Sequence, residues 1–210
     1  MKLSQIYKTY RTPPNLQEHM QKVARVAGLI CQHWSGPKID SLLIKKAALV
    51  HDLGNIVRFD IKSHPEFLGK EKTRADFWEK TQKEMVSQYG NDDHQATAQM
   101  LKEIGLEDKI IQLVLIKGFK NVLSIEKSKI WELKILLYAD MRVGPFGVIP
   151  LAERIDEAIS RWKKVDKNKW EGHIEACKRI EEQIQERVNL DLQKINQDLM
   201  GNRDFSDFEI

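Results

Sequence analysis

Apolar residues recur at steps of three and four along almost the whole chain, whereas the strict alternation typical of half-buried strands is scarce. In residues 15–34, for example, Leu16, Met20 and Val23 begin such a stripe. Asn15 follows two prolines and is a suitable N-terminal cap, and a Ser-Gly-Pro sequence ends the segment. The pattern predicts an all-α protein of about seven or eight helices.

Further helices are predicted where a capping residue precedes an apolar stripe and a glycine or proline follows it. Asp40 is a candidate cap for one helix, and Asp92 or Asp93 for another. Residues 55–73 contain Gly, Pro, Ser and scattered charges, which predict a loop or short helical turns. The last ten residues are expected to be loosely held. The remaining predicted helices cover residues 41–53, 74–90, 94–105, 106–119, 128–143 and 150–165, and a long charged helix runs from 169 to about 200.

The predicted C-terminal helix carries one apolar stripe on an otherwise charged surface. Such a stripe needs a partner, either the rest of the domain or a second copy of the chain. We therefore predict a helical domain over residues 1–150 and C-terminal helices over 151–210. These helices would pack on the domain, or on a partner chain in a homo-oligomer.

Composition narrows the function classes. The chain has 210 residues, of which 41% are hydrophobic and 31% charged, and its net charge is only +3. Lysines and arginines are spread along the sequence, so the basic face of a nucleic-acid binder is not expected. There is no membrane-length apolar run and no secretory signal, and Cys31 and Cys177 lie far apart. These features favour a cytoplasmic protein with reduced thiols, no membrane partner and no nucleic-acid partner.

The stretch AALVHDLGNI sets His51 and Asp52 side by side after a run of small and apolar residues. Burying a carboxylate or an imidazole is costly unless it has a partner. One interpretation is a plain hydrogen-bonded pair at a helix end. The other is that His19 and Asp140, which ends the apolar run IWELKILLYAD, meet this pair. Two imidazoles and two carboxylates suit a divalent ion, and Mn, Fe, Ni, Co, Zn and Mg all remain open.

This ordered set of a histidine, an adjacent His-Asp and a distant aspartate resembles the HD-domain metal-dependent phosphohydrolases. The matching segments read EHMQKVARVAGLI, KKAALVHDLGNI and LLYADMRVG, and a fourth, DDHQATAQMLKEIGLEDKIIQLV, is similar to the helix that follows the motif in many members. The resemblance covers roughly residues 11–145. It implies an HD metal-binding domain within residues 1–150, with one divalent ion bound by His19, His51, Asp52 and Asp140.

The sequence departs from the family pattern at two places. Members with two metals have further histidines, one of them matched here by His94, but the next helix, IIQLVLIKGFKNVL, contains none. The resemblance therefore implies one metal ion and leaves His94 to contact the substrate phosphate; the alternative is a surface histidine in a first helical turn. Some one-metal nucleotidases of the family carry a glutamate where this chain has Asn55. This difference leaves the proton-transfer group and the substrate open.

By this resemblance the protein would hydrolyse a small phosphorylated substrate, a nucleotide or another phosphomonoester, with metal-bound water as the nucleophile. Asp52 and His94 are the candidate catalytic residues. Cationic side chains near the motif would hold the phosphate, and arginine suits bidentate contact. The alternative for each cation is a solvated helix face. The candidates are Arg11, Lys46, Arg58, Lys117 and Arg142, of which Arg11 and Arg142 are preferred.

Two other functions compete with hydrolysis. The missing glutamate and histidines also fit a degenerate HD domain that binds a nucleotide or metal as a regulatory or interaction module. A third function is metal-dependent oxidation, which in this family uses a two-iron site rich in histidine. The chain has only six histidines, so oxidation is disfavoured.

Overall fold

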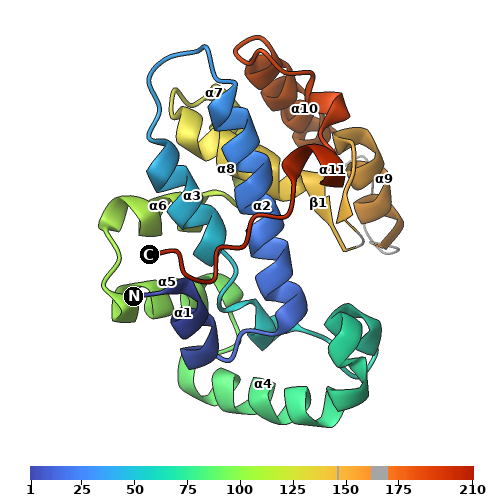
Figure 1. Ribbon diagram of the computed structural model, residues 1–210. Helices are drawn as coiled ribbons and strands as arrows, with labels where there is room; N and C mark the ends of the chain where they lie inside the picture. The colour runs from blue at the N-terminus through green and yellow to red at the C-terminus, as the bar shows by residue number, and fades with distance from the viewer. Residues whose placement is uncertain (146, 162–169) are drawn as a thin grey trace. The chain divides into compact units, whose positions relative to one another are not determined.

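The computed structural model describes residues 1–145, 147–161 and 170–210, and the regular structure in these residues is almost entirely helical (Figure 1). The all-α prediction is confirmed. The α-helices are α1 (Leu3–Thr9), α2 (Pro14–Gln32), α3 (Ser41–Val50), α4 (Ala75–Tyr89), α5 (Asp93–Ile104), α6 (Asp108–Ile116), α7 (Val122–Lys127), α8 (Trp131–Arg142), α9 (Leu151–Arg161), α10 (Glu171–Gln185) and α11 (Gln197–Met200). The 3-10 helices are η1 (Asn55–Arg58), η2 (Pro65–Arg74), η3 (Phe119–Asn121) and η5 (Leu192–Lys194).

Two of the capping residues identified in the sequence begin their helices, whereas the cap predicted at Asn15 is wrong because α2 already begins at Pro14. The Asp40 carboxylate accepts a hydrogen bond from the Leu43 amide at the start of α3, at 2.9 Å. Asp92 does the same for Gln95 at the start of α5, at 2.8 Å. Gly105 ends α5 in the left-handed conformation, with φ of 79°. These local interactions explain why the positions of α3 and α5 could be predicted from the sequence.

The chain forms two compact units, each assembled from separate segments. Unit 1 comprises residues 1–21, 49–115 and 204–210, and unit 2 comprises residues 22–48 and 116–203. Helices α2, α3 and α6 contribute residues to both. The predicted boundary at residue 150 stays a prediction.

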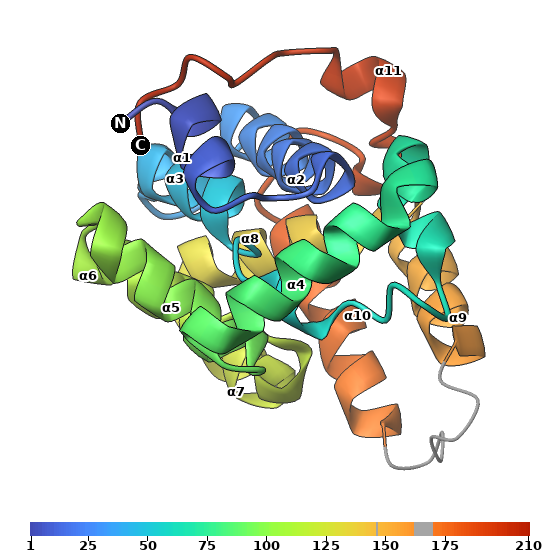
Figure 2. The same cartoon turned by 90° about the horizontal axis from the view of Figure 1, so that it is seen from below.

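In unit 1, η1 packs on both α4 and α5, and these two helices also contact each other (Figure 2). The side chain of Gln82 on α4 donates hydrogen bonds to the carbonyls of Ile56 and Phe59, at 2.8 and 2.6 Å. Ile56 itself is fully buried. The short segment that follows the His-Asp pair is therefore fixed to the helices around it and is not a free loop.

In unit 2, α8 is buried over most of its length and α10 packs on α7 and α8. Figure 2 shows α7 beside α10. Strands β1 (Val143–Gly144) and β2 (Gly147–Val148) form a small antiparallel pair directly after α8, where the sequence predicted only a break between helices. Among the described helices, none combines the length and the apolar character of a membrane span.

The predicted long helix from residue 169 to about 200 is wrong. Helix α10 ends at Gln185, and η5 and α11 follow as separate short elements. The backbone beyond α10 bonds to the end of α2 instead: the Ser35 amide donates to the Arg187 carbonyl at 2.7 Å, and the Asn189 amide to the His33 carbonyl at 2.9 Å. Residues 162–169, on which parts of two predicted helices fall, lie outside the described residues.

The expectation of a loose C-terminal tail is also wrong. Phe205 is buried at 3% exposure, and the tail runs beside α1. The Leu3 amide donates to the Phe208 carbonyl at 2.9 Å, and the Ser4 amide donates to the Ser206 carbonyl at 3.0 Å. Figures 1 and 2 both show the two ends of the chain next to each other.

Candidate metal centre

Two histidines of unit 1 approach each other at the predicted site. His19 lies on α2, and His51 follows the last residue of α3 in the turn that leads to η1. Their ring centroids are 5.3 Å apart with the planes at 65°. The His51 side chain is fully buried and that of His19 is 23% exposed. A partly exposed imidazole beside a buried one can bind a metal ion that solvent or a substrate still reaches.

Asp52 turns its carboxylate toward both imidazoles. Its Oδ1 is 3.5 Å from His51 Nε2, and its Oδ2 is 3.8 Å from His19 Nε2. Asn55 donates a hydrogen bond from Nδ2 to the same Oδ2 atom at 3.0 Å. The residue that replaces the expected glutamate therefore holds the Asp52 carboxylate and adds no charge of its own.

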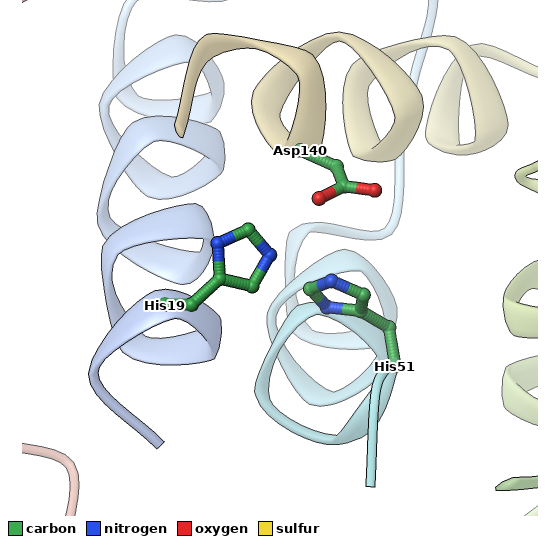
Figure 3. A group of neighbouring side chains, drawn as sticks. All are labelled: His19, His51 and Asp140. Atoms are coloured by element: carbon green, nitrogen blue, oxygen red, sulfur yellow. The ribbon is translucent and has the colours of Figure 1, made fainter. Parts of the chain in front are cut away.

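Asp140 offers a second carboxylate, from the last turn of α8. His19, His51 and Asp140 each offer one ligand atom, and these atoms all lie within 4.8 Å of one another (Figure 3). Lys117 Nζ donates to Asp140 Oδ2 at 2.6 Å, and the lysine side chain is only 7% exposed. The donor set of imidazole nitrogens and carboxylate oxygens fits a divalent cation.

His94 lies in the first turn of α5 and is half-buried. Asp92 and Asp93 precede it, and Asp93 accepts a hydrogen bond from Arg58 at 3.2 Å. The catalytic role predicted for His94 stays a prediction.

The predicted phosphate-binding cations occupy very different environments. Arg58 has an exposed side chain and is paired with Asp93. Lys46 is half-buried on α3. Lys117 is buried and paired with Asp140, a contact that was not predicted from the sequence. The sequence does carry a signal for this contact, because Lys117 and Asp140 each end an apolar helical run, where an ammonium and a carboxylate favour each other as partners.

Arg142 lies where a phosphate-binding role is disfavoured, contrary to the preference stated from the sequence. The side chain is fully buried in unit 2. It donates to the carbonyls of Ile149, Leu192 and Ile195, at 2.6, 2.6 and 3.0 Å, and to the Tyr138 hydroxyl at 2.7 Å. Its position two residues after Asp140 places it on a different face of α8. The buried guanidinium thus joins α8 to the segment that follows α10.

Arg11 lies at a cavity of about 260 Å³ in unit 1. It pairs with Glu84 and has a φ of 47°, which is uncommon for a residue with a side chain. Tyr10 and Tyr89 also line the cavity, and both hydroxyls donate to Glu103. Burial first, and then the hydrogen bond to Glu103 together with its charge, raises the pKa of each tyrosine to about 12. Arg11 is thus engaged by a carboxylate of its own unit.

Comparison with protein families identifies the chain. The HD domain family model matches residues 16–140, which is more than half of the sequence and includes His19, His51, Asp52 and Asp140. The chain therefore belongs to the HD domain family, whose members are generally metal-dependent phosphohydrolases. No curated protein and no solved structure matches this chain.

Proposed function

We propose that the protein is a metal-dependent phosphohydrolase that acts on a small phosphomonoester or nucleotide. The observation that carries the proposal is the approach of the His19, His51 and Asp140 ligand atoms to within 4.8 Å of one another, in a chain of the HD domain family. Asp52 would complete the ligand set, because its carboxylate is 3.5 Å from one of the imidazoles. A divalent ion bound there would neutralise phosphoryl charge and lower the pKa of an attacking water.

The residues around the ligands have separable tasks in this proposal. Asn55 orients Asp52 through its 3.0 Å hydrogen bond, so that the carboxylate keeps one oxygen for the ion or the nucleophilic water. Lys117 is the predicted phosphate-binding cation that directly contacts a proposed ligand. Its ammonium would contact a phosphoryl oxygen as the phosphate enters. His94 would move a proton to or from the substrate oxygen.

The proposal is tested by metal content and turnover. Purified protein is loaded with Mn²⁺, Co²⁺ or Ni²⁺ and assayed on a panel of nucleoside monophosphates and sugar phosphates. Asp52→Ala is expected to lose the bound metal, and to lose activity by roughly 10²–10⁴-fold because a group that positions or activates the water is gone. His33→Ala removes an exposed histidine outside the site and should change neither quantity.

Two results would count against the assignment. Unchanged metal content and activity in Asp52→Ala would remove Asp52 from the site. Metal binding without turnover of any phosphate would favour a regulatory or interaction module. The observation that favours this second candidate is Asn55, which cannot act as a carboxylate acid or base.

A further inference from the structure

The turn that carries His51 and Asp52 rests on helix α5 through one buried hydrogen bond. The Gly54 amide donates to the Thr97 hydroxyl at 3.0 Å. Thr97 is 3% exposed and Gly54 is also buried, so water does not compete for this bond. We propose that Thr97 is a positioning residue: its hydroxyl fixes the backbone that presents His51 and Asp52 to the metal. The proposal rests on the proposed function.

The close approach of the turn to α5 is also sterically defined. A side chain at Gly54 would place its Cβ 2.6 Å from the Thr97 amide nitrogen and 2.8 Å from the Ala96 Cβ. The first of these contacts is with backbone, which cannot rotate away. Only glycine therefore allows the turn to reach the Thr97 hydroxyl, and Gly54 and Thr97 form a matched pair.

The same contact links the turn to His94. Residues three apart on a helix are neighbours on one face, so His94 and Thr97 lie on the same side of α5. Thr97 contacts the backbone two residues after Asp52. A fixed distance between α5 and this turn therefore sets the spacing between Asp52 and His94, the two candidate catalytic residues. The hydrogen bonds from Gln82 hold η1 beyond the turn, so Thr97 acts on the part nearest the ligands.

Three variants test the inference. Thr97→Val keeps the shape but removes the acceptor, whereas Thr97→Ser keeps the hydroxyl. Thr81→Val is the matched control, because Thr81 is equally buried at 3% but donates only to the Phe77 carbonyl of its own helix, at 3.0 Å. Each protein is titrated with Mn²⁺ well below its unfolding temperature, and kcat and KM are measured on the best substrate found for the wild type.

Thr97→Val is expected to bind Mn²⁺ on the order of tenfold more weakly, as when groups that orient metal ligands are removed, with kcat reduced more than KM is changed. Thr97→Ser should stay within about twofold of the wild type, because a hydroxyl remains to accept the bond. Thr81→Val should bind metal as the wild type does, even if its thermal stability falls.

The outcomes separate the two proposals. Wild-type affinity in Thr97→Val overturns the inference alone, provided that the wild-type protein binds metal and hydrolyses a phosphate. Equal losses in Thr97→Val and Thr81→Val also overturn it, because the effect would then be general destabilisation. A wild-type protein that neither binds Mn²⁺ nor hydrolyses any phosphate overturns the proposed function, and the inference falls with it.

Discussion

Asp52 shows how the surroundings of one carboxylate determine what it can do. One oxygen faces His51 at 3.5 Å, and the other receives a hydrogen bond from Asn55. A carboxylate has enough lone pairs to keep such a bond and still bind a cation. An amide at position 55 therefore stabilises the ionised carboxylate without adding charge. A carboxylate there would have the opposite effect in the absence of metal.

Asn55→Asp is expected to separate the metal-free and metal-bound states. Two carboxylates about 3 Å apart repel each other, so the melting temperature of the metal-free protein should fall by about 2–6 °C. The added negative charge attracts a divalent ion, so the rise in melting temperature on saturation with Mn²⁺ should exceed that of the wild type. Thermal unfolding with and without Mn²⁺ measures both quantities.

Asn202→Asp is the control, since Asn202 is exposed and its side-chain oxygen is already an acceptor, from Gln197. Asn202→Asp should change the melting temperature by no more than about 1 °C, both without and with Mn²⁺. An identical Mn²⁺-induced rise in Asn55→Asp and the wild type would show that position 55 does not influence the ion.

At the scale of the elements, hydrogen bonds donated by side chains join helices to the segments that pack on them. Arg142 on α8 binds the carbonyl of Leu192 at the start of η5 and that of Ile195 just after it. Its Tyr138 partner donates in turn to Glu181 on α10, at 2.8 Å. This buried chain of polar groups connects α8 with α10 and with the segment that replaces the end of the predicted long helix. Each carbonyl would be left without its donor if the guanidinium were removed.

Arg142→Met is therefore expected to lower the free energy of unfolding by roughly 3–5 kcal/mol. Removing one member of a buried polar network leaves its partners buried without their hydrogen bonds. Urea denaturation measures the loss. Arg142→Lys should recover only part of it, because an ammonium cannot match the planar fork that reaches several acceptors.

Arg74→Met is the comparison, because Arg74 is 54% exposed and pairs with Glu71 only one turn away. An exposed pair of this kind contributes at most about 1 kcal/mol. If Arg142→Met were as stable as Arg74→Met, the role assigned to the buried guanidinium would be wrong.

At the scale of the molecule, contacts between distant parts of the sequence build the units. Residues 204–210 return to α1 and complete unit 1. Phe205 is buried there, and its ring meets that of Phe208 at 6.2 Å with the planes nearly perpendicular. The end of the chain therefore adds apolar contacts to a unit that also contains His19 and His51.

Phe205→Ala is expected to cost about 3–5 kcal/mol of unfolding free energy, because a buried phenyl group is lost and a cavity remains. Phe77→Ala, at a side chain that is 46% exposed, should cost far less. Chemical denaturation of the two variants under identical conditions provides the comparison. A cost for Phe205→Ala no larger than that for Phe77→Ala would show that the tail contributes little to unit 1.

The sequence by itself determined the helical class, the positions of α3 and α5 and the chemical types of the candidate ligands. Apolar periodicity and capping act within one or two helical turns, so they can be read locally. Asp40 and Asp92 illustrate this, because each caps its helix with its own side chain.

Only the tertiary structure decided which charges lie inside and what they contact. Lys117 and Arg142 were both predicted to bind phosphate, and the sequence did not show that both are buried, one paired with Asp140 and the other enclosed by carbonyls. The end of α10 and the course of the tail likewise depend on backbone partners at His33 and Leu3. These pairings join residues far apart in the chain, and their free energy depends on burial that exists only once the units have assembled.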